Sequence, residues 1–145
     1  MFIKALSKFH IFYLHEQVKR TRFLDAERPI VSDLRVAVVG AGLMGADHVI
    51  RIENRIIGAQ VSAIVEPDEG RAKAALETAP NATWYPNIEA AIAAKAMDAV
   101  LIATPGQFHE PVLLPALVAG LPILCEKPLT ADAASSLKIV EAEVA

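Results

Sequence analysis

Between residues 36 and 45 the sequence reads Val36-Ala37-Val38-Val39-Gly40-Ala41-Gly42-Leu43-Met44-Gly45. This run fits the pattern Gly-x-Gly-x-x-Gly, with an apolar strand expected before it and a helix after it. Gly40 permits a tight turn, Gly42 lets the backbone approach a pyrophosphate, and Gly45 lets the helix pack closely on the strand. In this context the run predicts a dinucleotide-binding turn, although the glycine pattern alone also fits an ordinary tight turn.

The phosphates of such a ligand are expected at the start of the helix that follows the turn. The first N–H groups of a helix have no partners within it, and the helix dipole favours negative charge there. We therefore expect the cofactor to be bound by Gly40, Gly42, Leu43, Met44 and Gly45.

Short apolar runs alternate with helical stretches from residue 34 to the end of the chain. The expected strands are residues 34–39, 61–65, 83–85, 99–103 and 123–125. The expected helices are residues 43–55, 68–78 with Asp68 as its N-cap, 88–95, 108–119 ending at Gly120, and 131–144 capped by Thr130. Because the strands are continuously apolar, they predict a parallel sheet covered on both faces, which is a doubly wound α/β fold.

Glu66 lies 21 residues after Gly45, at the end of the second expected strand. An acidic side chain at this place typically hydrogen-bonds the ribose hydroxyls of adenosine. A carboxylate there also repels the additional phosphate of NADP, so the sequence favours NAD over NADP as the cofactor. Two alternatives stay open: Glu66 is a solvated loop residue, or Asp68 takes the ribose role. Arg71 fits either an exposed helix residue or a partner of the adenosine half.

Two further strands end in polar or charged residues, at the edge where ligands bind in such sheets. The fourth strand ends in Thr104-Pro105, and the fifth is followed directly by Glu126-Lys127. A lysine beside a cofactor can serve as a general base or hold a substrate hydroxyl, which makes Lys127 the candidate catalytic residue. The alternative is that Glu126 and Lys127 only close the strand end through a salt bridge.

Composition limits the classes of function. The 145 residues include 14 Lys+Arg, 17 Asp+Glu and one cysteine, and the length suits a single domain. A net charge of -3 argues against a nucleic-acid partner, and one cysteine excludes both an internal disulfide and a cysteine-built zinc site. The longest uncharged apolar run, residues 111–125, is too short and too rich in proline to span a membrane. We expect a cytoplasmic protein without a metal, in which Cys125 is a small apolar residue rather than a reactive thiol.

Residues 1–33 differ from the rest of the chain. Residues 1–35 carry seven basic and four acidic side chains and five of the eight aromatic residues. This shift predicts an N-terminal extension, residues 1–33, joined to an acidic domain, residues 34–145. Apolar residues at Phe2, Leu6, Phe9 and Tyr13 fit one face of a helix. An amphipathic docking helix, a segment packed on its own domain and upstream sequence translated from an early start codon all remain open.

Four groups of residues together match a known family in order and spacing over residues 34–145. They are 40–45 with His48, 65–68, 103–105 with His109, and 125–129, of which the last is more specific than the glycine pattern. On these residues the sequence resembles the glucose–fructose oxidoreductase and inositol dehydrogenase family of NAD(P)-dependent oxidoreductases. The resemblance does not cover the extension.

The resemblance implies a Rossmann domain that binds the cofactor, with Lys127 as the active-site lysine. It implies that the nicotinamide side is lined by Ala103, Thr104, Pro105, His109, Glu126 and Lys127 itself. His48 is interpreted as structural, and His109 either as near the nicotinamide or as stabilising its loop. Members of this family oxidise secondary hydroxyls of polyols, sugars or sugar acids, or catalyse the reverse reduction. The hydroxyl proton then leaves through a relay that contains the lysine.

Family members normally continue into a second α/β domain, which holds the substrate, adds an Asp and a His to the relay and often forms an oligomer interface. This chain stops at Ala145, within the helix after the lysine motif. Three hypotheses stay open: the cofactor domain of an NAD-dependent polyol or sugar dehydrogenase, a stand-alone NAD(H)-binding module, and an inactive fragment. We expect the chain alone to bind cofactor without turnover. A polyol or sugar substrate and a homo-oligomeric partner are expectations for the full-length form.

Overall fold

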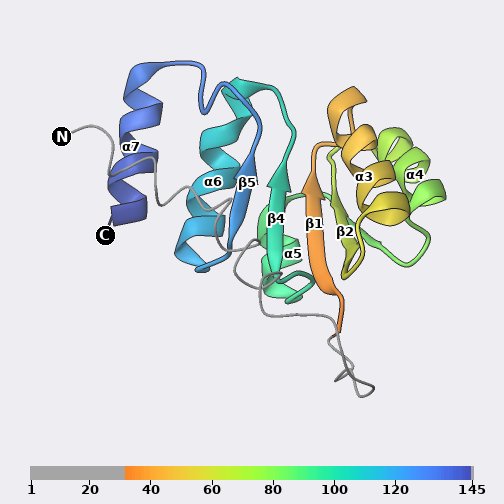
Figure 1. The fold of residues 1–145 in the computed structure, drawn as a ribbon. Helices are drawn as coiled ribbons and strands as arrows, with labels where there is room; N and C mark the ends of the chain where they lie inside the picture. The colour runs from red at the N-terminus through yellow and green to blue at the C-terminus, as the bar shows by residue number, and fades with distance from the viewer. Residues whose placement is uncertain (1–31, 145) are drawn as a thin grey trace. The chain divides into compact units, whose positions relative to one another are not determined.

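The computed structural model describes residues 32–144, which form a parallel sheet with helices on both faces (Figure 1). The strands are β1 (Leu34–Val39), β2 (Ala59–Val65), β3 (Thr83–Tyr85), β4 (Ala99–Ile102) and β5 (Ile123–Cys125). Their order in the sheet is β3-β2-β1-β4-β5, and all neighbouring strands are parallel. The doubly wound α/β fold predicted from the sequence is therefore confirmed.

The helices of the described residues cover the two faces of this sheet. They are α3 (Leu43–Arg55), α4 (Glu69–Thr78), α5 (Ile88–Ala93), α6 (His109–Val118), which follows a 3-10 turn η1 (Gly106–Phe108), and α7 (Ala133–Val144). Val36 and Val38 of β1 pack with α3 and α4, whereas Ala37 and Val39 pack on the face of α5, α6 and α7. Alternate residues of a strand point to opposite faces, so β1 is buried from both sides and reads as one apolar run.

Side-chain caps and one left-handed residue set several helix ends. The Asp68 carboxylate accepts a 2.8 Å hydrogen bond from the Arg71 N–H at the start of α4, as predicted. Asn87 does the same for the Ala90 N–H at the start of α5. Gly120 adopts a φ of 68° just after α6, which confirms it as the residue at which that helix ends.

The prediction that Thr130 caps the last helix is wrong. Helix α7 begins at Ala133, and the Asp132 carboxylate accepts a 2.9 Å hydrogen bond from the Ser135 N–H. The Thr130 hydroxyl instead donates to the Asp132 carbonyl at 2.7 Å and contacts the Ser136 hydroxyl. Asp132 therefore occupies the N-cap position, and Thr130 braces the loop before it.

Other boundaries differ by a few residues from the expected ones. Strand β2 begins at residue 59 rather than 61, because Ala59 and Gln60 pair with Leu34 and Arg35 of β1 although Gln60 is polar. Strand β4 ends at residue 102 and helix α5 at residue 93, each slightly early. Helix α6 begins at residue 109 rather than 108, after η1. These differences move none of the candidate site residues to another edge of the sheet.

The chain divides into two units between residues 31 and 32. Almost all of the predicted extension, residues 1–33, lies outside the described residues, so its amphipathic helix remains a prediction. Within residues 32–144, no helix combines the length and the apolar character needed to cross a membrane.

Candidate functional site

The loops after β1 and β4 meet at the carboxyl edge of the sheet, which is the upper edge in Figure 1. Strands β1 and β4 are neighbours in the middle of the sheet, and the order of strands reverses between them. In open α/β sheets ligands bind at this switch point. Gly40 has a φ of 88°, and a Cβ atom there would lie 2.9 Å from Cγ2 and 3.0 Å from the backbone nitrogen of Thr104. Only glycine therefore fits the closest approach of the two loops.

The other two glycines of the turn, Gly42 and Gly45, differ in the space that is available for a side chain. A Cβ atom on Gly45 would overlap with the carbonyl oxygen of Gly40, so the close contact between helix and turn requires glycine. A Cβ atom on Gly42 would meet no atom of residues 32–144 within 4 Å. Within these residues the backbone at Gly42 is therefore open, as a close approach of a pyrophosphate would require. The structure supports a packing role for Gly45 and an accessible backbone at Gly42.

Helix α3 has Gly42 as its N-cap residue and therefore lacks a side-chain cap, in contrast to α4 and α5. Its first turn carries no acidic residue, and the side chains of Leu43 and Met44 are exposed. This helix start leaves backbone donors and the positive end of the helix dipole for an anion. The absence of a cap, together with the open Gly42, fits a phosphate of a dinucleotide.

Thr104 adds a second sign that a ligand fits here. Its Oγ1 atom is buried and has no hydrogen-bond partner among the described residues. Buried hydroxyls are normally paired, because an unpaired one costs about 1–3 kcal/mol. The resemblance places Thr104 on the nicotinamide side, beside Ala103 and Pro105. A polar group of a bound cofactor is one partner that this hydroxyl can take.

Glu66 lies beneath the glycine turn, directly after β2, and is 3% exposed. Its Oε2 accepts a 2.8 Å hydrogen bond from the Ala41 N–H. Its Oε1 accepts from the Asp68 N–H at 3.0 Å and from the Arg71 guanidinium at 2.8 Å. Burial acts to raise the pKa of Glu66, but the Arg71 hydrogen bond and the two backbone N–H groups outweigh it and hold the pKa below its usual value. Glu66 is thus an ionised carboxylate tied to the turn, not a solvated loop residue.

Glu126 connects helix α3 to the loop that carries Lys127. Its Oε1 lies 2.9 Å from Nε2 of His48, and its Oε2 accepts a longer, 3.4 Å hydrogen bond from the Lys127 backbone N–H. The hydrogen bond from His48 is the main cause that lowers the pKa of Glu126. Within the described residues, the side-chain partner of Glu126 is His48 on another element rather than the side chain of Lys127.

His109 is almost completely buried, with 1% exposure, at the start of α6. Its Nε2 lies 2.7 Å from the Thr104 carbonyl oxygen and its Nδ1 lies 2.9 Å from the Leu129 carbonyl oxygen. The ring thus bridges the loops that follow β4 and β5. Of the two roles predicted for His109, this burial fits loop stabilisation. Cys125 lies 3.3 Å from the same Nδ1, and burial raises the pKa of its thiol to about 11, so it is not an activated thiol.

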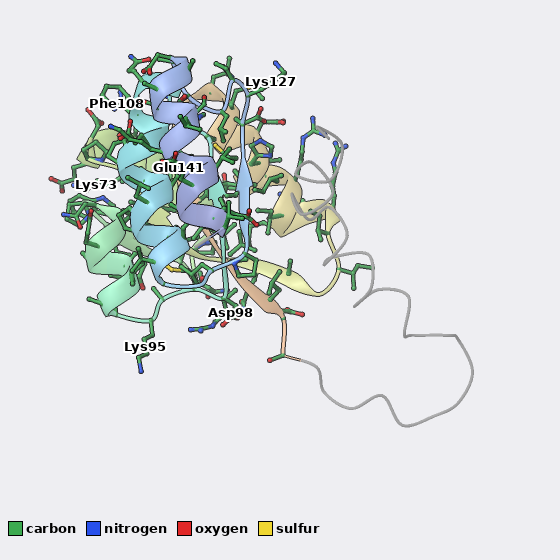
Figure 2. The ribbon with its side chains drawn as sticks, turned by 90° about the vertical axis from the view of Figure 1, so that its left-hand side faces the viewer. Lys73, Lys95, Asp98, Phe108, Lys127 and Glu141 are labelled. Atoms are coloured by element: carbon green, nitrogen blue, oxygen red, sulfur yellow. The ribbon has the colours of Figure 1, made fainter. Side chains whose placement is uncertain are left out.

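Lys127 is exposed at the same edge as Phe108, whereas Lys95 and Asp98 lie at the opposite edge (Figure 2). The described residues hold its backbone through Glu126 and do not bury its amine. Within the described part of the chain, the Lys127 side chain is therefore exposed at the carboxyl edge.

The structure also identifies contacts that sequence reasoning missed. The Ala41 N–H was not expected to bind Glu66, and His48 was not expected to bind Glu126. Asp68 caps α4 with its carboxylate, which argues against its taking the ribose role. No feature of a single sequence pairs residues 48 and 126, because the contact joins two elements that are distant in the chain.

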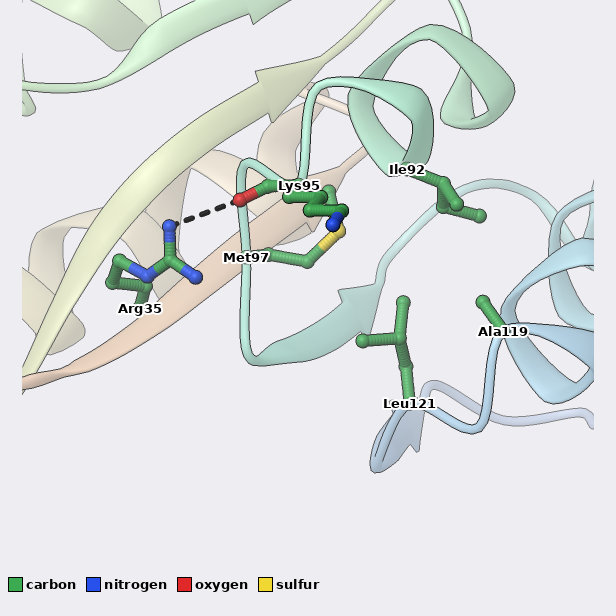
Figure 3. A pocket seen from close by; sticks show the side chains of 6 residues that line it. All are labelled: Arg35, Ile92, Lys95, Met97, Ala119 and Leu121. Atoms are coloured by element: carbon green, nitrogen blue, oxygen red, sulfur yellow. Dashed lines mark hydrogen bonds between the residues drawn. The ribbon is translucent and has the colours of Figure 1, made fainter.

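A pocket of about 410 Å³ lies at the amino edge of the sheet, away from these loops (Figure 3). It is lined by Arg35, Ile92, Lys95, Met97, Ala119 and Leu121. Arg35 at its margin forms a bidentate ion pair with Asp98 and donates to the Lys95 carbonyl at 3.0 Å. None of the lining residues belongs to the predicted cofactor site. Among residues 32–144, no cluster of His, Cys, Asp or Glu suited to a metal ion is present.

Comparison with known proteins shows which proteins this chain is similar to. An inositol 2-dehydrogenase of Corynebacterium glutamicum (strain R) is 71% identical over 110 residues, which are 76% of this chain and 33% of that protein. An inositol 2-dehydrogenase of Leifsonia xyli subsp. xyli (strain CTCB07) is 61% identical over 111 residues, which are 77% of this chain and 32% of that protein.

A solved structure of an inositol dehydrogenase is also similar to this chain. The myo-inositol dehydrogenase from Lactobacillus casei, in complex with NAD(H) and myo-inositol, is 34% identical with a TM-score of 0.74, over 77% of this chain and 33% of that one. The chain thus spans about a third of the length of these relatives. The model of an oxidoreductase family with an NAD-binding Rossmann fold matches residues 34–145. Sheet order, glycine turn and family match agree, and the chain belongs to this family of NAD-binding oxidoreductases.

Proposed function

We propose that residues 34–145 are the cofactor domain of an NAD-dependent dehydrogenase that oxidises a secondary hydroxyl of a polyol, with myo-inositol as the first candidate. Relatives at 71% and 61% identity are inositol 2-dehydrogenases. The observation that carries the proposal is the junction at the carboxyl edge. There an open phosphate turn at Gly42 is joined, through His48 and Glu126, to the loop of Lys127.

The residues at this edge can hold NAD in a definite order. The backbone N–H groups at the start of α3 take the pyrophosphate, with Gly42 leaving the approach open. Glu66 takes the adenosine ribose. A carboxylate has about four acceptor positions, and three are occupied by Ala41, Asp68 and Arg71, which leaves one on Oε2. The Thr104 hydroxyl, together with Ala103, Pro105 and Glu126, faces the nicotinamide half.

We further propose that NAD is preferred over NADP. The ionised Glu66 repels a 2'-phosphate on the same ribose. Arg71, whose side chain is 55% exposed, opposes this effect in part, but its guanidinium is already paired with Glu66 at 2.8 Å. The net result is a preference for NAD that depends on the Glu66 charge.

In the proposed reaction, bound NAD supplies the acceptor for the hydride of the carbinol carbon. Lys127 holds the hydroxyl group and removes its proton as the carbonyl forms. Its exposed amine can reach a substrate above the edge, while its backbone N–H donates a 3.4 Å hydrogen bond to Glu126. For the whole protein we propose a second domain that holds the polyol and supports a homo-oligomer, in the cytoplasm.

The test is a titration of the purified chain with NADH and NADPH, followed by an assay with myo-inositol and NAD. We expect NADH to bind more tightly than NADPH and no turnover by this chain alone. In a whole two-domain protein, Lys127→Ala should reduce kcat far more than cofactor affinity. Failure to bind NADH would overturn the proposed function. Robust polyol-dependent NADH production by the chain would overturn the assignment to a domain without its own turnover.

A further inference from the structure

Glu126 is held on both of its carboxylate oxygens by groups from different parts of the fold. Oε1 is bound by the His48 ring, 78 residues away on α3, and Oε2 is bound by the backbone N–H of Lys127. With an ionised carboxylate as acceptor, Nε2 of His48 must carry the hydrogen. The result is a continuous path of contacts from helix α3 to the backbone of the proposed catalytic lysine.

This contact differs from an ordinary surface ion pair in its place and its burial. The side chains of His48 and Glu126 are 20% and 30% exposed, whereas the pair Arg51–Asp47 on the same helix is 57% and 46% exposed. Helix α3 is also the helix that begins at the glycine turn. His48 therefore joins the helix that follows the glycine turn to the residue next to Lys127 through one side-chain contact.

We propose that His48 is a positioning residue for Lys127 and for the nicotinamide side of the site, acting through Glu126. The inference rests on the proposed function, because it assumes that NAD binds along this edge. The Lys127 loop is held at two points: Glu126 before the lysine by His48, and Leu129 after it by His109. His48 is thus the contact that links the loop to the pyrophosphate end, while the Lys127 amine itself stays free to move.

The first experiment compares two ligands on the 145-residue chain. NADH contains the nicotinamide half, whereas ADP-ribose contains only the adenosine, the pyrophosphate and the second ribose. His48→Leu removes the donor to Glu126, and we expect NADH affinity to fall about fivefold, as for one net hydrogen bond. ADP-ribose affinity should stay within a factor of about two. An equal loss for both ligands would mean that His48 only supports the fold, and would overturn the inference.

Three further variants separate positioning from general packing. His48→Gln keeps an N–H donor at a similar reach, so it should restore NADH affinity. Asp47→Asn breaks the exposed pair with Arg51 on the same helix without touching Glu126, so it should change neither ligand. In the background of Glu126→Leu, His48→Leu should have no further effect on NADH, because its path is already broken. Full additivity of the two changes, or no rescue by glutamine, would contradict the proposal.

A second measurement does not depend on any ligand. Backbone order parameters from 15N relaxation report the rigidity of the Lys127 amide, with about 0.85 for rigid and below about 0.6 for flexible backbone. His48→Leu should lower the value for Lys127, while His48→Gln and Asp47→Asn should not. An unchanged value in His48→Leu would overturn the inference even if NADH binds. A different outcome is that the wild-type chain binds neither NADH nor ADP-ribose, while His48→Leu still lowers the order parameter of Lys127. That result would overturn the proposed function, and the role of His48 would be limited to ordering the Lys127 loop.

Discussion

Glu66 and Ala41 are joined by a 2.8 Å hydrogen bond, in which the N–H between the first two glycines of the turn donates to the buried carboxylate. The proposed ribose acid is therefore also a support of the proposed phosphate turn. Both functions depend on the same charge, since the carboxylate is held ionised by Arg71 and by two backbone N–H groups. A change at Glu66 should therefore weaken the binding of both the adenosine ribose and the pyrophosphate.

Replacing Glu66 by alanine should weaken NADH binding by about tenfold or more, because lost hydrogen bonds to a charged group cost about 1.5–3 kcal/mol. It should also narrow the preference for NADH over NADPH, because the charge that repels the 2'-phosphate is gone. Titration with both cofactors gives the two values. Glu69→Ala is the matched control, since Glu69 on α4 is exposed and pairs with Lys73. Unchanged NADH affinity in Glu66→Ala would move the ribose role to Asp68 or dismiss it.

The stability of the chain should fall in acid, partly because of Glu66. Its folded-state pKa lies below the unfolded value of about 4.3, so the unfolded chain binds more protons and stability rises with pH in this window. The contribution is complete above about pH 4.3 and is lost as the pH falls through the lower, folded-state pKa. Urea unfolding at pH 7 and at several values between pH 5 and 3 measures the loss. The free energy of unfolding of Glu66→Gln should fall less over this pH range than that of the wild type. Equal decreases in the two proteins would contradict the role of this carboxylate.

The fold was predictable because its strands are buried on both faces. The runs at residues 34–39 and 123–125, and the helix at residues 43–55, have the expected bounds, since continuous apolar runs and the glycine turn mark them directly. The start of β2 at Ala59 was not predictable from hydrophobicity, because Gln60 is paired through its backbone. The N-cap of α7 was mistaken because Thr130 and Asp132 are both suitable caps, and only the geometry distinguishes them.

The candidate site was predictable as a list of positions but not as a set of contacts. The edge of the sheet on which Gly42, Glu66, Thr104 and Lys127 lie follows from the parallel topology. The hydrogen bonds between Glu66 and the turn, and between Glu126 and His48, depend on side-chain placement across elements. Their direct contacts with a cofactor remain predictions.

His109 should be required for stability as well as for the site. His109→Leu leaves the carbonyl oxygens of Thr104 and Leu129 without the ring between them, and a buried unpaired acceptor costs about 1–3 kcal/mol. A neutral ring can donate to only one of the two carbonyls, so the expected loss is that of one hydrogen bond. Urea unfolding measures it. Phe108→Leu, at the exposed neighbouring position, should change stability by less than about 0.5 kcal/mol. Equal stability of the wild type and His109→Leu would contradict the proposed role of His109 in stabilising the two loops.

Gly42 and Gly45 offer the sharpest test of the glycine turn, because one methyl group should have opposite effects at the two positions. Gly45→Ala forces its Cβ against the Gly40 carbonyl, so we expect a loss of about 3 kcal/mol in the free energy of unfolding. Gly42→Ala meets no neighbour among residues 32–144 and has an ordinary φ of -71°, so stability should change by less than about 0.5 kcal/mol. The methyl group would nevertheless stand where the pyrophosphate approaches, and NADH affinity should fall by about tenfold or more. Thermal unfolding and NADH titration of both variants separate the effects. A stable Gly42→Ala chain that binds NADH like the wild type would show that the phosphates do not approach at this point.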